Sequence, residues 1–257
     1  MGLRNACRVT FRNAEGSELC GHIERPQDRE PYAWAIFAHC FTCNKNYKAP
    51  VFISRYLADA GIATLRFDFP GLGGSSGDFA DTTLSGYVRD VVSAASFLTQ
   101  HFRSPRVLIG HSMGGASVLL AGSQISGVEL IATVGAPSKP GQLGKNLQVA
   151  REQAVERGIG ELLVNGRTYR LRRDFFDDLE RHDLHKGLDA LRSKLLIVHS
   201  PSDDIVPYEN AKRLMEWAHA PKYLLTLDSE ADHLLSREQD AYQVAHAIVI
   251  RVRKGVH

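Results

Sequence analysis

The sequence has no long uninterrupted apolar run. Its most apolar region, from Val118 to Ala136, is interrupted by several polar residues, whereas a membrane-spanning helix needs about 20 predominantly apolar residues. This absence excludes a helical membrane span. We therefore expect the protein to act without a membrane partner.

Export signals are absent as well. The N-terminus, MGLRNACRVT, has no apolar signal core, and Ala6 stands where a myristoylation site needs Ser or Thr. A cytoplasmic location is therefore predicted. Cysteine is scarce, with four residues at positions 7, 20, 40 and 43. In a chain without a secretion signal we expect free thiols rather than a disulfide framework.

A strong charge imbalance is also missing. Lys and Arg total 31 and Asp and Glu total 29, which leaves a formal net charge of +2. This balance argues against general binding to nucleic acid or to an anionic membrane surface. With 44% hydrophobic and 23% charged residues, the chain is not expected to be disordered. Its 257 residues suit one large domain or two small ones.

Short apolar runs alternate with helical patterns along the chain. The later runs, such as Val107–Ile109 and Leu195–Val198, are continuous, as in strands buried on both faces of a mostly parallel sheet. The first two runs are more polar and predict an antiparallel pair at one edge. The predicted strands are Arg8–Arg12, Leu19–Glu24, Ala33–Ala38, Ala63–Phe67, Arg106–Gly110, Leu130–Val134, Lys194–His199 and Lys222–Leu227.

Between these runs, apolar residues recur at the i, i+3, i+4 spacing of a helix face. One such face extends from Leu84 to Ala95, after an N-cap at Thr82 or Thr83. Further helices are predicted at Ala49–Ala60, Met113–Ser123, Glu209–Ala218 and from Tyr242 to Val252. The alternation predicts an α/β fold, with about eight mostly parallel strands and helices on both faces of the sheet.

The stretch at about 137–192 breaks this alternation, because it holds no strong buried-strand run. It contains a polar helical segment at Gln148–Arg157 and a hairpin at Leu162–Leu171 that turns at Asn165-Gly166. A second helical piece carries Phe175 and Phe176. We interpret the chain as a single domain, 1–257, with a cap-like insertion at about 137–192.

Gly110-His-Ser-Met-Gly114 matches the pattern G-x-S-x-G, with a predicted strand before it and a helix after it. That context is the one in which the pattern forms a nucleophile elbow. A sharp turn strains the backbone of Ser112 and exposes its hydroxyl, and the small residues let neighbouring backbone pass close by. The helix N-terminus also favours negative charge that develops near the serine. The pattern predicts that Ser112 is a catalytic nucleophile.

A serine nucleophile needs a base and an acid that orients the base, in the chain order Ser, acid, His. Of the eleven histidines, His233 lies in the loop between the last predicted strand and the last helix. That loop can fold back over the edge of the sheet where Ser112 sits. Asp203 and Asp204 both follow the strand Lys194–His199, and either one suits the role of the acid.

These features together make the chain resemble an α/β-hydrolase-fold serine hydrolase over nearly its whole length. The family pattern H-G-x-x-D-x-x-V is matched by His199, Asp203 and Val206, which selects Asp203. The family's oxyanion loop is matched by residues 39–43, where Cys40 replaces the usual glycine. The resemblance implies an oxyanion hole formed by the backbone N–H groups of Phe41 and Met113.

Three segments resemble a bacterial subgroup in which the hydrolase is often fused to an OsmC-like domain, a domain that this chain does not show. They are Phe37–Cys43, Leu65–Gly73 and His199–Asp204. The main expectation is a carboxylesterase-like serine hydrolase that acts on a small acyl substrate and needs no cofactor or metal. The substrate pocket is expected to involve His39, Cys40, Phe175, Phe176 and Leu234.

Other functions remain open. The same catalytic residues suit a thioesterase, a peptidase or a dienelactone-type hydrolase, because one fold hosts many chemistries. Cys40-x-x-Cys43 follows a strand, as a thiol-redox pair does, so a non-enzymatic or redox partner protein is a second class. The Gly71–Gly77 stretch fails the dinucleotide pattern because Ser76 stands where glycine is needed. The oligomeric state is not predicted.

Overall fold

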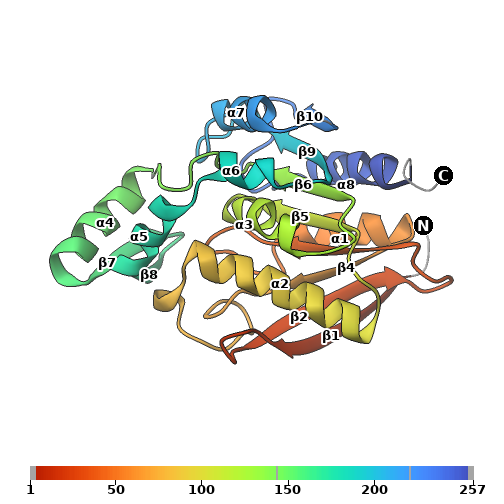
Figure 1. The fold of residues 1–257 in the computed structure, drawn as a ribbon, viewed down its shortest axis with the longest axis horizontal. Coiled ribbons are helices and arrows are strands. Elements are labelled where there is room, and N and C mark those ends of the chain that lie inside the picture. Colours follow the sequence, from red (N-terminus) through yellow and green to blue (C-terminus); the bar gives the residue numbers. More distant parts are fainter. Residues whose placement is uncertain (1–3, 143, 220, 254–257) are drawn as a thin grey trace.

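The computed structural model describes residues 4–142, 144–219 and 221–253. An eight-stranded sheet forms its centre, in the order β1-β2-β4-β3-β5-β6-β9-β10 (Figure 1). β2 is antiparallel to β1 and β4, and the other neighbours pair in parallel. The strands are β1 (Arg4–Arg12), β2 (Glu18–Pro26), β3 (Ala33–Ala38), β4 (Ile62–Phe67), β5 (Val107–His111), β6 (Leu130–Val134), β9 (Lys194–His199) and β10 (Lys222–Thr226).

This topology confirms the predicted α/β fold class and the antiparallel pair at one edge. The prediction placed the start of the first strand at Arg8, which is wrong by four residues, because Arg4 to Cys7 pair with residues of β2 from Pro26 to Ile23. A polar sequence can extend an edge strand because only backbone groups are needed for the pairing.

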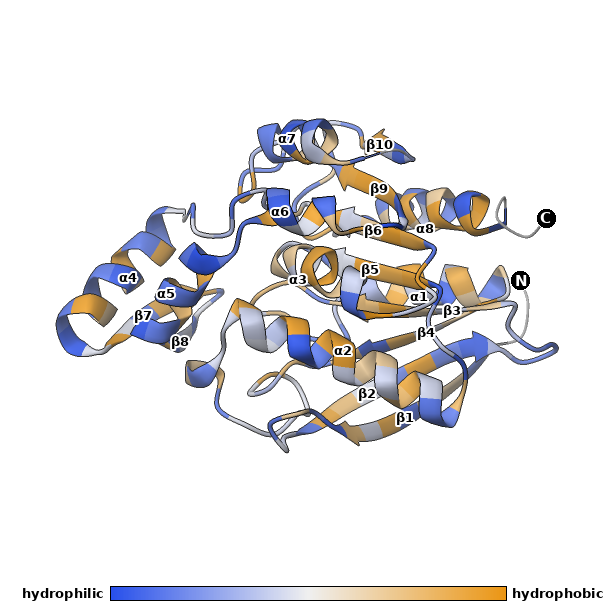
Figure 2. Ribbon diagram, in the orientation of Figure 1, coloured by the Kyte–Doolittle hydropathy of each residue, from blue (hydrophilic) through white to orange (hydrophobic). Residues whose placement is uncertain are grey.

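Helices cover both faces of the sheet. α1 (Lys48–Asp59) and α8 (Glu238–Arg253) pack on one face, while α2 (Leu84–His101), α3 (Met113–Ala121) and α7 (Glu209–Trp217) pack on the other. Within each central strand, neighbouring side chains enter opposite cores, as Leu108 and Ile109 do. Both faces are covered, which is why these strands are continuously apolar. Figure 2 shows the hydrophobic colour concentrated in β5, β6 and β9.

The segment between the neighbouring strands β6 and β9 lies outside the main sheet. It contains α4 (Lys145–Arg157), β7 (Ile159–Val164), β8 (Arg167–Arg172), α5 (Arg173–Arg181) and α6 (Leu184–Asp189). β7 and β8 form the predicted hairpin, and its turn residues Asn165 and Gly166 both have positive φ, as a type I′ turn requires. The interpretation as a single domain with a cap-like insertion stays a prediction.

The insertion is tied to the helical layer that covers one face of the sheet. Asp178 of α5 accepts hydrogen bonds from the backbone N–H and the hydroxyl of Ser85, at 2.8 and 2.6 Å, at the start of α2. Leu184 and Leu188 of α6 join the same core as α3. Within the described ranges, no helix is long and apolar enough to cross a membrane.

Candidate active site

Ser112 lies in the sharp turn between β5 and α3. Its backbone has φ 54° and ψ −120°, a region that residues with a Cβ atom rarely enter. The flanking glycines explain how the chain can make this turn. A Cβ atom on Gly110 would lie 2.2 Å from the carbonyl oxygen of Gly114, and one on Gly114 would lie 2.3 Å from that of Ala38. The local geometry therefore has the form of a nucleophile elbow.

The end of the neighbouring strand β6 connects the elbow to the other candidate residues. The backbone N–H of Ser112 donates to the carbonyl of Val134 at 2.8 Å, at the end of β6. The next residue, Gly135, has φ 55°, and a Cβ atom there would lie 3.1 Å from Asp203 Oδ2 and 3.2 Å from His233 Nδ1. Ser112, Asp203 and His233 therefore all lie near Val134 and Gly135, at the carboxyl end of β6, and their catalytic roles stay predictions.

Asp203 and His233 are directly hydrogen bonded. His233 Nδ1 lies 2.7 Å from Asp203 Oδ2, and Asp203 Oδ1 accepts the backbone N–H groups of Ile205 and Val206 at 3.0 and 2.8 Å. Burial alone would raise the pKa of Asp203, but hydrogen bonds from His199 and His233 outweigh it and hold the pKa well below its usual range. The carboxylate is therefore charged, and its Oδ2 atom faces the rings of both His233, at 2.7 Å, and His199, at 3.4 Å.

Ser112 as a whole residue is 9% exposed. Among the hydrogen bonds of the described residues, none joins Ser112 Oγ to His233 Nε2. In enzymes without bound substrate this contact is often long and shortens only when substrate binds. The arrangement supplies a hydroxyl, a base and an orienting carboxylate in one corner of the sheet.

The loop after β3 packs against the start of α3. A Cβ atom on Gly114 would also lie 2.5 Å from the carbonyl oxygen of His39, so residues 38 and 39 touch the elbow. Phe41 lies in the loop after β3, and its backbone N–H has no backbone acceptor among the described residues. Met113 is the first residue of α3, where a backbone N–H has no partner within the helix. Neither N–H group has a backbone acceptor in the described parts of the chain, and their role as an oxyanion hole stays a prediction.

Cys40 and Cys43 form a disulfide, so the prediction of free thiols is wrong for this pair. The backbone N–H of Cys43 donates to the carbonyl of Cys40 at 3.2 Å, and this turn brings the two Cα atoms to 5.3 Å. That separation lies within the range that a disulfide spans. Cys7 and Cys20 are free thiols, as predicted.

The residues expected around the substrate differ in their surroundings. Phe175 and Phe176 are 0% and 2% exposed, and Phe175 stacks on Phe41 with ring centroids 5.0 Å apart. His39 is buried, with Nδ1 donating to the carbonyl of Cys40 at 2.7 Å and Nε2 accepting from the N–H of Phe69 at 3.4 Å. Their pocket roles stay predictions, as does that of the partly exposed Leu234.

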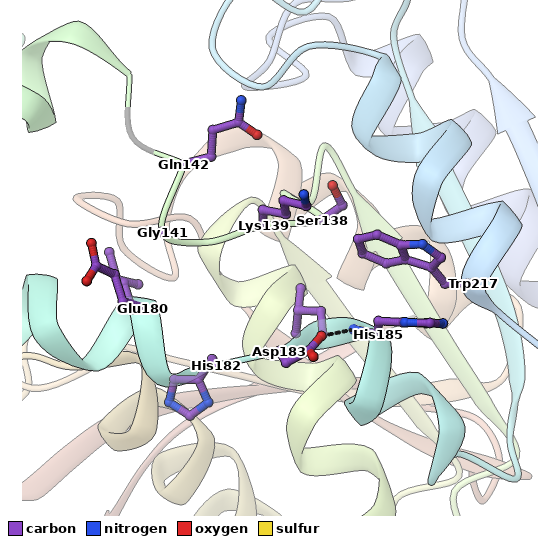
Figure 3. A pocket seen from close by; sticks show the side chains of 11 residues that line it. Ser138, Lys139, Gly141, Gln142, Glu180, His182, Asp183, His185 and Trp217 are labelled. Atoms are coloured by element: carbon purple, nitrogen blue, oxygen red, sulfur yellow. Dashed lines mark hydrogen bonds between the residues drawn. The ribbon is translucent and has the colours of Figure 1, made fainter.

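A cavity of about 710 Å³ lies beside the segment that follows β6, at residues 138–142 (Figure 3). Ser138, Lys139 and Gln142 form one side, the α5–α6 junction forms another, and Trp217 of α7 borders a third. His185 stacks on Trp217 with ring centroids 5.1 Å apart. None of the residues expected in the substrate pocket lines this cavity.

Two further histidines at the site were not assigned a role from the sequence. His111 precedes Ser112, and its Nε2 lies 2.7 Å from the carbonyl oxygen of His233. His199 ends β9, and its Nε2 lies 2.8 Å from the carbonyl oxygen of Val206 and 3.4 Å from Asp203 Oδ2. Each histidine lies within a recognised motif and at the end of a buried strand. These two features of the sequence could have identified both as site residues.

Metal ligation receives no support from His182, which is partly buried, or from the exposed His185. His182 Nε2 lies 2.9 Å from the Ser85 hydroxyl and 3.4 Å from Asp178, and His185 stacks on Trp217. In the parts of the chain that the structure describes, no three His, Cys, Asp or Glu residues form a group that could hold a metal ion.

Solved structures repeat this architecture. The esterase domain of a Rhodothermus marinus protein is 38% identical, covers 97% of this chain and 98% of its own, and superposes with a TM-score of 0.78. Est1E from Butyrivibrio proteoclasticus, solved with ferulic acid bound, is 22% identical, covers 95% and 99% of the two chains, and has a TM-score of 0.78. The second likeness shows the fold alone.

Among curated proteins, the mouse palmitoyl-protein thioesterase ABHD10, named as mitochondrial, is 24% identical over 215 residues, which cover 80% of this chain and 71% of the relative. The predicted cytoplasmic location and bacterial origin therefore stay predictions. The sequence model of the alpha/beta hydrolase family matches residues 35–256. The match includes the elbow, the strands around it and the loops that carry Asp203 and His233. This chain belongs to the alpha/beta hydrolase family.

Proposed function

We propose that the protein is a serine hydrolase that cleaves an ester or a related acyl bond. The observation that carries the proposal is the hydrogen bond between His233 Nδ1 and Asp203 Oδ2, at 2.7 Å, beside a serine with φ 54°. A base oriented by a charged acid, next to a serine in a strained backbone conformation, is the arrangement that nucleophilic acyl transfer requires.

In the proposed reaction, Ser112 attacks the carbonyl carbon of the substrate and His233 takes the hydroxyl proton. Asp203 keeps the proton on Nδ1 of His233, so that Nε2 faces the serine as the base, and it stabilises the ring once that is charged. His233 then gives the proton to the leaving group, which departs as an alcohol. Water then attacks the acyl carbon while His233 takes a proton from it. The bond to Ser112 Oγ breaks, His233 returns the proton to that oxygen, and the carboxylic acid is released.

The oxyanion of each tetrahedral intermediate is proposed to lie between the backbone N–H groups of Phe41 and Met113. The first N–H belongs to the loop after β3 and the second to the start of α3, where the helix dipole adds favourable potential. Donors of this kind each contribute about 10²–10³ in rate. The contact between the 38–39 segment and Gly114 supports this pairing.

A thioesterase is the second candidate on the same catalytic residues. It is favoured by the mouse relative that is named a palmitoyl-protein thioesterase, whereas the Rhodothermus neighbour named an esterase domain favours oxygen esters. Peptidase and dienelactone-type activities have no such support. The carboxylesterase assignment is therefore our first choice.

A thiol-redox function has weaker support. The disulfide exists, but Cys40 and Cys43 are each only 5% exposed. Thiol–disulfide exchange with a partner protein requires access of the attacking thiolate to one of the two sulfur atoms. Burial of both sulfur-bearing residues favours a structural role in the loop that carries Phe41.

The decisive experiment removes the nucleophile. Ser112→Ala should abolish p-nitrophenyl acetate hydrolysis and labelling by a fluorophosphonate probe, with an unchanged thermal unfolding midpoint. Ser123→Ala, at an exposed serine just after α3, serves as the matched control and should keep both signals. Full labelling of the Ser112→Ala variant would show that another residue is the nucleophile.

The choice between ester and thioester follows from a substrate panel. p-Nitrophenyl esters and S-acyl thioesters of matched acyl lengths should be compared by kcat/KM. Faster turnover of the oxygen esters supports the carboxylesterase assignment, and faster turnover of the thioesters would replace it with the second candidate.

A further inference from the structure

A buried histidine links the elbow to the loop that carries His233. His111 ends β5 and is 2% exposed. Its Nε2 lies 2.7 Å from the backbone carbonyl oxygen of His233, a residue 122 positions away in sequence. The two rings are also neighbours, with centroids 5.1 Å apart and planes at 42°. The contact therefore joins the residue before the proposed nucleophile to the proposed base.

The contact has a defined donor and acceptor. Because the carbonyl oxygen of His233 can only accept, Nε2 of His111 carries the proton and donates it. Burial and the neighbouring His233 lower the pKa of His111 to about 3, so the ring of His111 is neutral at neutral pH. A neutral ring also places no positive charge beside His233 when the latter becomes protonated during the reaction.

The bond adds a restraint on the peptide group of His233 to a loop that its own turns and the burial of Ala231 and Leu235 in the core also hold. The His233 loop folds on itself through backbone hydrogen bonds from Ala231 to Asp228 and from Leu235 to Asp232, at 3.2 and 3.1 Å. Leu235 has φ 51°, an uncommon conformation for this residue type. Asp203 holds the ring of His233 and His111 holds its peptide group, so the base is fixed at two points.

We propose that His111 is a positioning residue, which places the imidazole of His233 between Asp203 and Ser112 by holding the backbone carbonyl of His233. The proposal rests on the proposed function, in which His233 is the base. Rotation of the His233 peptide would move the ring away from Asp203 even though neither side chain had changed, and small displacements of catalytic groups reduce rates strongly.

The test compares variants that keep or remove the donor. In His111→Gln the amide N–H reaches about as far as Nε2, whereas His111→Leu and His111→Met fill similar space without a donor. In the two donor-free variants we expect kcat for p-nitrophenyl acetate to fall about 10- to 100-fold, with KM within about twofold. His111→Gln should recover most of the rate.

A pH profile separates positioning from simple loss of stability. If His233 loses its alignment with Asp203, its charged form is less stabilised, so the acidic limb of kcat/KM against pH should shift to lower pH. His111→Gln should restore the wild-type limb. The titratable neighbours of His111 are His233, Asp203 and His39, and all three remain in every variant.

Two outcomes would overturn the proposal. One is a donor-free variant with wild-type kcat and an unshifted acidic limb. If neither donor-free variant folds, His111→Asn decides, since its shorter amide is polar but does not reach the carbonyl, and wild-type behaviour there would equally overturn it. Ser112→Ala is measured in parallel: turnover by that variant removes the proposed function itself, while its inactivity together with a normal His111→Leu removes only the role of His111.

Discussion

Asp203 and Asp204 are adjacent in one turn but differ in their surroundings: Asp203 belongs to the proposed site, and Asp204 lies on the surface. Asp203 is buried and points its Oδ2 at His233, while its Oδ1 accepts two backbone N–H groups from the same turn. Asp204 is exposed. The backbone bonds orient the carboxylate before any substrate arrives, so reorganisation during the reaction is small.

At this scale we expect Asp203→Asn to lower kcat for p-nitrophenyl acetate by about 10³–10⁴. The amide oxygen can still accept the N–H groups of Ile205 and Val206, so its NH₂ group faces His233 and favours the wrong tautomer. Steady-state kinetics, with thermal unfolding to establish folding, provide the measurement.

Asp204→Asn is the matched control and should keep kcat within about twofold. If Asp204→Asn were the inactive variant and Asp203→Asn the active one, the assignment of the acid would be wrong.

Among the elements, the loop of residues 39–45 is held from several sides. The disulfide joins Cys40 to Cys43, and the Phe41 ring lies between Phe175 of α5 and Phe79, with centroid distances of 5.0 and 5.1 Å. Tyr169 of β8 donates its hydroxyl to the carbonyl of Thr42 at 3.2 Å. The insertion therefore buttresses the loop that carries the proposed oxyanion donor.

Removing the disulfide should lower both the stability of the protein and its activity. The closed loop is very short, so its contribution to the free energy of unfolding in the chain-entropy view is only about 2 kcal/mol. We expect Cys40→Ala/Cys43→Ala to remain folded, with a Tm lower by roughly 4–8 °C. Its kcat should fall about tenfold, less than the 10²–10³ lost when an oxyanion donor is removed outright, because the N–H of Phe41 is less firmly held.

The control for this change is Cys7→Ala, since Cys7 is an exposed free thiol, and it should behave as wild type. A double variant with unchanged kcat would show that the disulfide does not contribute to the alignment of the loop.

On the scale of the whole molecule, two cores on opposite faces of the sheet enclose a few buried polar groups. Asp90 of α2 is 3% exposed and accepts a hydrogen bond from Asn13 Nδ2 at 2.7 Å. Burial raises the pKa of Asp90 to about 7, because the low-dielectric surroundings disfavour its charged form. The folded state therefore binds a proton that the unfolded chain, with an ordinary carboxyl pKa, has already released.

The stabilising contribution of this protonated carboxyl is complete below the ordinary carboxyl pKa and is lost as the pH rises through about 7. We expect Asp90→Asn, which stays neutral and can still accept from Asn13, to be more stable than wild type at pH 8.5. The gain should be at most about 4 kcal/mol, or roughly 10 °C in Tm, and should shrink toward pH 5.

Thermal unfolding by circular dichroism from pH 5 to pH 8.5 measures this trend. Glu152→Gln, at an exposed position on α4, should show no such pH-dependent gain. A constant difference between Asp90→Asn and wild type across the whole range would contradict the assigned protonation.

Much of the fold could be predicted because it depends on local patterns. The continuous apolar run of β5 needs cover on both faces, and the glycines at 110 and 114 leave room for the backbone atoms that approach them. The hairpin was predictable because Asn165-Gly166 accepts the positive φ of its turn. The polar start of β1 was not predictable, because its residues show no strand pattern and form a strand only by pairing with β2.

The sequence alone determined the α/β architecture, the position of the elbow and the order of Ser112, Asp203 and His233, because each depends on spacing and residue type along the chain. The disulfide of Cys40 with Cys43 and the bond from His111 to the peptide of His233 depend on how loops meet in space. Loop geometry is set by packing against distant elements, such as Phe175 on Phe41, and such contacts leave no periodic trace in the sequence. The tertiary structure was therefore needed to show that Asp203 and His233 are hydrogen bonded and that the peptide of His233 is held by His111.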